Sequence, residues 1–198
     1  MNLGNIKANT GLKFCWLGCK NLTTLDLGST VSVGEYFCHQ GCNNLTTLDL
    51  GSTVSVGNYF CWFGCTNLTT FNLTNAAVIK SWFCREGCKK INTLYLPGTI
   101  SVNAYFCHDG CDNVTTLDLT SATSVGEDFC KGGCNNLTTL DLTSATSIGE
   151  EFCYTGCENL TTLTLKKVTY IAGYFCYGSC EKLTTLDLTG MSDSNGVG

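Results

Sequence analysis

Residues 45–67 read LTTLDLGSTVSVGNYFCWFGCTN, and this stretch of 23 residues recurs along nearly the whole chain. Cysteine pairs of the form C-x-x-x-C mark its phase, because each pair begins 23 residues after the previous one without an insertion or deletion. A fixed period of about 20 to 50 residues is typical of solenoids, in which each repeat forms one coil that packs only against its neighbours. The sequence therefore predicts a stack of coils.

The repeat assigns the whole chain of 198 residues to a single domain. Residues 1–21 form a degenerate first unit, residues 22–182 contain seven regular units, and residues 183–198 contain a partial last unit and a tail. A chain of this length can bury one continuous core. We therefore expect one solenoid over residues 1–198 and no second domain.

Each unit begins with the pattern of a short strand. Leu45, Leu48 and Leu50 have the L-x-x-L-x-L spacing, and the alternation that it contains is the period of a half-buried strand. Leu48 and Leu50 are expected to point inward, while Thr47 and Asp49 point outward. Stacked units would pair these strands in parallel about 4.8 Å apart and so form one sheet wall.

The second half of the unit leads back to the start of the next coil. After a Gly-Ser-Thr turn, Val54 and Val56 are expected to point inward on the return side. Gly57 ends that segment, and the aromatic and cysteine residues after it fit one or two helical turns with Phe60 facing the core. The predicted fold class is an α/β solenoid with one parallel β-sheet wall and short helical or 3-10 segments on the opposite wall.

The order of these elements resembles the BspA-like leucine-rich repeat. The resemblance rests on L-x-x-L-x-L at a 23-residue period, on V-x-V/I-G with an aromatic residue after it, and on a cysteine three residues before the next leucine; it covers residues 22–189. Phe60-Cys61 replaces the usual alanine–phenylalanine pair of the family, and the turn after the strand is shorter, with Pro97 as the one conforming proline. The resemblance implies a right-handed leucine-rich-repeat coil stack and a cell-surface or secreted protein for adhesion or interaction, without enzymatic activity.

The sixteen cysteines are predicted to have a structural role. They stand where small apolar residues should pack, and free cysteine is among the most buried residue types, so a ladder of buried thiols is the main interpretation. Two cysteines four positions apart on a helix hold their Cβ atoms about 5–6 Å apart, too far for a disulfide, which requires about 3.8 Å. Disulfides between coils, such as Cys38 to Cys65, and a metal site stay open as alternatives. The ladder consists of Cys15, Cys19, Cys38, Cys42, Cys61, Cys65, Cys84, Cys88, Cys107, Cys111, Cys130, Cys134, Cys153, Cys157, Cys176 and Cys180.

The outward face of the strands carries a column of threonines beside a column that is mostly aspartate. Strand propensity and packing between coils explain the threonines. Neighbouring aspartates repel each other unless solvent or a cation intervenes, so we interpret them as a solvated surface, with calcium along the aspartate row as the alternative and no other cofactor expected. A regular threonine array could also form an ice-binding face, although the aspartates disrupt its uncharged regularity. The residues that represent these columns are Thr47, Asp49, Thr116, Asp118, Thr139 and Asp141.

The wall opposite the strands carries the residues that vary most between units. Aromatic residues precede the core phenylalanine in several units, and others lie between the two cysteines at positions expected to be exposed. Half-buried tyrosines that cover an edge of a solenoid are ordinary, whereas large aromatic side chains exposed together often mark contact sites. The candidate interaction surface lies in the N-terminal half and consists of Trp16, Leu17, Tyr36, Tyr59, Trp62, Phe63, Trp82 and Tyr105.

Composition argues against several other classes of function. The net charge is -5 and the 11 Lys and Arg residues form no run, so a nucleic-acid partner is not expected. No segment approaches the about 20 apolar residues that span a bilayer, and the first residues lack the pattern of a secretory signal, so neither membrane insertion nor a signal peptide is expected. Catalysis requires several groups in one pocket, but His39 and His108 lie three units apart, so no enzyme is expected.

The sequence thus predicts a non-enzymatic protein-interaction or structural module. Repeats in perfect register, without a clear polar cap at either end, favour contact with another protein or end-to-end assembly with further copies of the chain. A cell-surface adhesin or carbohydrate binder that uses the aromatic wall is the alternative, and an ice-binding face on the threonine column is the third hypothesis. The compartment follows from the resemblance alone, which suggests the cell surface or secretion.

Overall fold

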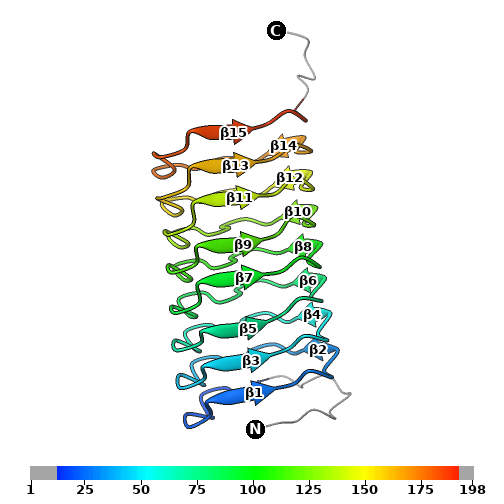
Figure 1. The fold of residues 1–198 in the computed structure, drawn as a ribbon, viewed down its shortest axis with the longest axis vertical. Helices are drawn as coiled ribbons and strands as arrows, with labels where there is room; N and C mark the ends of the chain where they lie inside the picture. Colours follow the sequence, from blue (N-terminus) through cyan, green and yellow to red (C-terminus); the bar gives the residue numbers. More distant parts are fainter. Residues whose placement is uncertain (1–12, 192–198) are drawn as a thin grey trace.

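The computed structural model describes residues 13–191, which form one stack of coils (Figure 1). Each complete coil has a three-residue strand, a turn, a two-residue strand and a run of turns that leads into the next coil. Paired strand residues are 23 positions apart, as in Thr24 and Thr47, so one coil corresponds to one repeat. The predicted solenoid is confirmed, and the outermost parts of the first unit and of the tail lie outside the described residues.

The L-x-x-L-x-L segments form the first wall as parallel strands of three residues. These strands are β1 (Thr24–Asp26), β3 (Thr47–Asp49), β5 (Thr70–Asn72), β7 (Thr93–Tyr95), β9 (Thr116–Asp118), β11 (Thr139–Asp141), β13 (Thr162–Thr164) and β15 (Thr185–Asp187). They are arranged in the order β1-β3-β5 and then β7-β9-β11-β13-β15. The alternation is as predicted, because Leu48 and Leu50 are fully buried while Thr47 and Asp49 are partly exposed.

A second parallel sheet forms another wall, where the sequence predicted only one. Its seven strands are β2 (Ser32–Val33), β4 (Ser55–Val56), β6 (Val78–Ile79), β8 (Ser101–Val102), β10 (Ser124–Val125), β12 (Ser147–Ile148) and β14 (Tyr170–Ile171). Val56 is fully buried as expected, but Val54 is exposed, which corrects its predicted position. The turn directs Thr53 into the core instead, where its Oγ1 donates a hydrogen bond to the carbonyl of Thr30 in the preceding coil at 3.1 Å.

The first wall is interrupted between β5 and β7, while the second wall continues through β6 (Figure 1). At the interruption, Phe71 occupies a position that is leucine in the other strands. Its half-buried ring lies 5.7 Å from the ring of Phe60 and 6.1 Å from that of Phe83, measured between centroids. A ring takes more space than a leucine, and an oversized core side chain displaces the backbone around it. We therefore attribute the interruption to Phe71.

A stack of phenylalanine rings runs through the core, with one ring from each coil. Successive ring centroids lie 5.1–5.2 Å apart, and the rings are within 9° of parallel. The rings from Phe37 to Phe152 are fully buried. Burial of one such side chain contributes about 1.5–3 kcal/mol, so every coil adds a similar increment to the stability of the stack.

The wall that carries the cysteines has no helix among residues 13–191, so the predicted helical segments are wrong. Every second residue has positive φ there, as in Tyr36 (58°), Cys38 (50°), Gln40 (49°) and Cys42 (56°). The N–H of His39 donates to the carbonyl of Tyr36 at 3.3 Å, and a positive φ at the third residue of such a turn is typical of type II. We call this run of consecutive turns the turn wall. In the same part of the chain, no helix is long and apolar enough to cross a membrane.

Hydrogen bonds between coils explain why the chain adopts this conformation. A non-glycine residue in the left-handed region costs about 1–2 kcal/mol. The positive-φ residues donate alternately to the two neighbouring coils: the N–H of Tyr36 to the carbonyl of Asn58 at 2.9 Å, and that of Cys38 to the carbonyl of Phe14 at 2.8 Å. Each such bond contributes about 0.5–1.5 kcal/mol, which offsets most of the cost, whereas a helix would direct these N–H groups along its own coil.

The glycine before the second cysteine is required because successive coils approach closely there. A Cβ atom at Gly64 would lie 2.2 Å from the carbonyl oxygen of Cys38 and 2.8 Å from that of Gly41. In the last coil Ser179 occupies this position, and its hydroxyl contacts the carbonyl of Cys153. An end coil can shift outward to make room, whereas an inner coil is held on both sides.

Replacement of Gly64 by alanine should therefore destabilise the protein by about 1–3 kcal/mol, because the added methyl group overlaps backbone on the preceding coil. Gly173→Ala is the matched control, since a Cβ atom there meets nothing within 4 Å. The measurement is the urea midpoint of unfolding, which should fall for Gly64→Ala and stay level or rise slightly for Gly173→Ala. Equal midpoints for the two variants would contradict the close packing described above.

Candidate interaction surface

Three columns of side chains run along the turn wall, and each coil contributes one residue to each column. The first column, directly before the core phenylalanine, consists of Lys13, Tyr36, Tyr59, Trp82, Tyr105, Asp128, Glu151 and Tyr174. The second column, directly after the first cysteine, consists of Trp16, His39, Trp62, Arg85, His108, Lys131, Tyr154 and Tyr177. The rim column comes next and consists of Leu17, Gln40, Phe63, Glu86, Asp109, Gly132, Thr155 and Gly178. Every residue of the predicted interaction surface belongs to one of these columns.

Four consecutive aromatic residues of the first column stack face to face. The ring centroids of Tyr36 and Tyr59 are 4.5 Å apart, those of Tyr59 and Trp82 are 6.0 Å apart, and those of Trp82 and Tyr105 are 3.7 Å apart. The rings are within 9° of parallel, and all four side chains are half-buried. Aromatic pairs contribute about 0.5–1.5 kcal/mol beyond their buried area. The inner rings therefore have both faces covered.

Trp62 connects the first and second columns. Its ring centroid lies 5.1 Å from that of Tyr59 and 5.8 Å from that of Trp82. The guanidinium of Arg85 lies 4.9 Å from the ring centre of Trp82 and 5.6 Å from that of Trp62, within the range of cation–π attraction. Trp62 was expected to be exposed but is half-buried, because it packs between rings of neighbouring coils.

The exposed apolar side chains lie at the border of this surface. Leu17 is 54% exposed, and Trp16 and Phe63 are each 39% exposed. Phe63 stacks on Trp62 with centroids 5.2 Å apart. His39 links Trp16 to Trp62, at centroid distances of 6.1 Å and 4.9 Å respectively. The structure thus joins the predicted residues of the first and third coils into one continuous aromatic surface.

His39 lies at the centre of the aromatic surface and was not singled out from the sequence as part of it. The ring of Tyr36 meets it edge-on at 5.6 Å, and Trp16 and Trp62 pack on its other sides. Burial lowers the pKa of His39 from its ordinary value of 6.5. Its Nδ1 and the indole Nε1 of Trp62 are both buried without a hydrogen-bond partner. The imidazole therefore packs among the aromatic rings in its neutral form.

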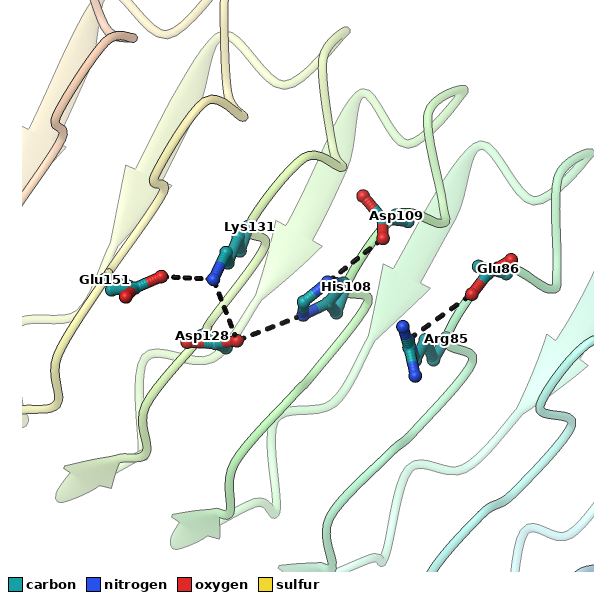
Figure 2. Close-up of polar contacts among 7 residues, drawn as sticks. All are labelled: Arg85, Glu86, His108, Asp109, Asp128, Lys131 and Glu151. Carbon is teal, nitrogen blue, oxygen red and sulfur yellow. Dashed lines mark hydrogen bonds and ion pairs between the residues drawn. The ribbon is translucent and has the colours of Figure 1, made fainter.

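A chain of ion pairs continues the columns where the aromatic residues end (Figure 2). The imidazole of His108 lies between two carboxylates, with Nδ1 3.2 Å from Asp128 and Nε2 3.0 Å from Asp109. The Nζ atom of Lys131 lies 3.4 Å from Asp128 and also pairs with Glu151 in the next coil. The hydrogen bond from Lys131 to Glu151 raises the pKa of the lysine. The network cross-links neighbouring coils.

Sequence reasoning missed this network, although a signal for it exists. Lys131 and Glu151 are 20 positions apart, which places a basic residue of the second column beside an acidic residue of the first column in the next coil. Opposite charges at these two repeat positions could have been found by aligning the units.

The aspartates of the strand face cap the turns that follow the strands. Asp49 Oδ1 accepts hydrogen bonds from the N–H of Gly51 and from Nδ2 of Asn72, both at 2.9 Å. Asp118 and Asp141 accept in the same way from the N–H two residues further on, at 3.2 Å and 2.9 Å. This pattern is an Asx-turn. The aspartate row therefore has a structural explanation, and calcium along it stays an untested alternative.

The threonines of the strand face form the predicted outward column. Thr116 and Thr139 are exposed, and Thr47 is half-buried. Thr47 pairs in register with Thr70, and the column is then interrupted between β5 and β7 like the rest of the wall. Ice binding requires long uncharged regularity, so the interruption and the adjacent aspartates give this face no support as an ice-binding surface.

The cysteines line the core side of the turn wall. All those from Cys38 to Cys157 are fully buried. The first pair forms a disulfide, Cys15–Cys19, so the expectation that cysteines four positions apart cannot bond is wrong. That expectation assumed a helix, whereas two consecutive turns hold these Cα atoms 5.5 Å apart, within the range of disulfides. Among the described residues, the one group of three or more potential metal ligands within 4.8 Å of one another is Cys15, Cys38 and Cys42.

Comparison with known protein families identifies a repeat family. A family model described as BspA type Leucine rich repeat region, with 6 copies of the repeat, matches residues 12–106 and residues 82–194. The two matched ranges together include all of the described residues, 13–191. No curated protein and no solved structure matches the sequence.

Protonation of His39 should destabilise the protein in mild acid. Because its pKa is lowered in the folded state, the unfolded chain binds the proton more readily, and the free energy of unfolding should fall as the pH drops below about 6.5. His39→Tyr, which copies Tyr154 and Tyr177 at the same repeat position, should lose less stability between pH 7.5 and pH 5. Urea unfolding of both proteins at the two pH values measures how much stability each protein loses. The contributions of His108 and the carboxylates are the same in both proteins and cancel when the two losses are compared. Parallel losses in the two proteins would contradict a neutral, buried His39.

Proposed function

Because the chain belongs to the BspA-type leucine-rich repeat family, we propose that it is a non-enzymatic module that binds a partner protein through the aromatic part of the turn wall. Domains of this family are protein-interaction or structural modules, and they are commonly extracellular or on the cell surface. We propose the same location for this protein. The observation that carries the proposal is the continuous aromatic surface between Trp16 and Tyr105, with apolar side chains exposed at its border.

The geometry of the rings favours a protein partner over a carbohydrate. Sugars bind aromatic residues by stacking on an open ring face. The faces of Tyr59 and Trp82 are covered by neighbouring rings of the same column. Ring edges and the rim residues Leu17 and Phe63 remain for contact, and these suit apolar side chains of another protein.

The distribution of charge around the surface supports the same conclusion. Protein interfaces have an apolar centre rich in aromatic residues and arginine, surrounded by a polar rim. Here Lys13 lies 4.2 Å from the ring centre of Trp16 at one end, and Arg85 pairs with Glu86 at 3.4 Å towards the other. In the two coils after that of Arg85, the second column continues with His108 and Lys131, which belong to the ion-pair network of Figure 2. The aromatic centre and its charged border therefore have the arrangement that is typical of a protein interface.

Replacement of Leu17 and Phe63 by glycine should weaken partner binding at least about tenfold without unfolding the protein. Both residues have positive φ, 56° and 53°, a conformation that glycine adopts without the cost that other residues incur. Gly132 and Gly178 already occupy this column in other coils. The double variant should therefore be at least as stable as the wild type. Capture from a cell extract identifies the partner, and biolayer interferometry then compares the affinities.

Thr155→Gly is the matched control, because Thr155 also belongs to the rim column and has a φ of 52° but lies outside the aromatic surface. This variant should bind the partner as the wild type does. Unchanged affinity of the Leu17→Gly, Phe63→Gly double variant would refute the proposed surface. A glycan array on which the wild type binds sugars would favour the adhesin or carbohydrate-binding alternative instead.

End-to-end assembly with another copy is a second candidate, and the last coil supports it. Leu186 is 42% exposed there, whereas Leu163, its equivalent in the preceding coil, is fully buried. β14 and β15 are also the outermost strands of their sheets, and an outer strand presents unpaired N–H and C=O groups. Another coil of the same repeat would cover both features, so a second copy fits this end.

Leu186→Lys should abolish such assembly, because a charge would enter the apolar contact between copies. Thr185→Lys is the control, since Thr185 lies on the outward face of the same strand. Sedimentation velocity over a concentration series should show larger species for the wild type and for Thr185→Lys but only monomers for Leu186→Lys. A wild type that stays monomeric at high concentration removes this candidate and leaves the partner protein.

A further inference from the structure

We propose that every C-x-x-x-C pair of the repeat is a dithiol site that a small-molecule disulfide oxidises to a disulfide within its own coil, as in Cys15–Cys19. This modification would give one covalent bridge per coil along the whole turn wall. It does not depend on which partner the aromatic surface binds.

The backbone of the bonded pair is repeated in every other coil. The first cysteine of each pair has a φ of 49–52°, and the second has a φ of 52–58°, with Cys15 and Cys19 inside these ranges. The run of turns that brings Cys15 and Cys19 together therefore exists at each of the other pairs. Closure of those pairs requires no change in the backbone.

The sulfur atoms of the free pairs are already close. Their Sγ–Sγ separation is 2.7–2.9 Å in five coils, whereas even two non-bonded carbon atoms have their optimum at about 3.5–4.0 Å. A disulfide bond is about 2.05 Å long, so the sulfurs need to approach by less than about 1 Å. The five pairs are Cys38 and Cys42, Cys61 and Cys65, Cys84 and Cys88, Cys107 and Cys111, and Cys130 and Cys134.

Pairing between coils is the competing arrangement, since a first cysteine such as Cys61 also has a side-chain hydrogen bond with Cys88 of the next coil. The bond from Cys15 to Cys19 argues against it. If the first cysteine of each coil were bonded to the second cysteine of the next coil, Cys15 would be bonded to Cys42. Because Cys15 is already bonded to Cys19, this arrangement would leave Cys42 without a partner. Pairing within coils uses every cysteine.

Oxidation would follow ordinary thiol–disulfide exchange. One cysteine thiolate attacks the small disulfide, forms a mixed disulfide with the protein and releases one small thiolate. The second cysteine, as thiolate, then attacks the protein sulfur of the mixed disulfide and displaces the other small thiolate. The protein pair loses two protons and two electrons, and the oxidant becomes two thiols.

The timing of this reaction follows from burial. The cysteines from Cys38 to Cys157 are fully buried, so a small-molecule disulfide cannot reach them once the coils have stacked. The inner pairs therefore close during folding, before the next coil covers them. Disulfides persist in oxidising compartments, which agrees with the extracellular location proposed above.

The chain contains a direct readout for this proposal. Trypsin cleaves after Lys80, Arg85 and Lys89, which separates Cys84 in residues 81–85 from Cys88 in residues 86–89. The full chain is unfolded with its cysteines reduced and is then refolded in a buffer that contains oxidised glutathione as the small disulfide. Remaining thiols are alkylated in denaturant before digestion and mass spectrometry. The expected product is residues 81–85 linked to residues 86–89, and a reductant should separate the two peptides.

Other products would overturn the proposal. Residues 86–89 linked to residues 21–80, or residues 81–85 linked to residues 91–131, would show pairing between coils. Alkylated Cys84 and Cys88 in soluble, folded protein would show a ladder of free thiols.

Discussion

The spacing of about 5 Å between successive coils is the constraint on which the rest of the structure depends. Parallel strands require a separation of about 4.8 Å, and the centroids of the stacked phenylalanine rings are 5.1–5.2 Å apart. The backbone and the core are therefore compatible with the same distance between coils. Each unit of 23 residues must return the chain to the same place one step further on. Any insertion in a unit would move its N–H and C=O groups out of reach of their partners in the neighbouring coil.

The same spacing accounts for the turn wall. A helix is about 10–12 Å across with its side chains, so helices on one wall would force the coils further apart there than on the strand wall, and the stack would curve. The run of turns keeps the 5 Å step instead: Cys61 N–H donates to the carbonyl of Phe37 at 2.8 Å, and Cys84 N–H to that of Phe60 at 2.8 Å. The result is the straight stack in Figure 1. To keep this spacing on the turn wall, tyrosine, tryptophan and cysteine residues adopt left-handed φ values, which are unfavourable for residues other than glycine.

Because the coils repeat about every 5 Å, residues at the same repeat position form a column along the stack. The residue types in each part of a column then determine which interactions form there. Aromatic residues in consecutive coils stack, as Trp82 and Tyr105 do at 3.7 Å. Where acidic and basic residues follow, as at Asp128 and Lys131, the same positions form ion pairs. The scaffold is therefore nearly uniform, and the chemical character of its surface depends on the few positions that differ between coils.

The sequence by itself determined the period, the stacking of the coils and the direction of the strand residues, because these follow from spacing within one unit: Leu48 is buried and Thr47 faces outward as its alternation requires. It also located the aromatic surface, although not the packing of His39 and Trp62 inside it. The tertiary structure alone decided the second sheet, the exposure of Val54, the turn wall and the Cys15–Cys19 bond. All of these depend on hydrogen bonds and contacts to residues in the neighbouring coil, about one repeat away, and periodicity within a single unit carries no information about such contacts.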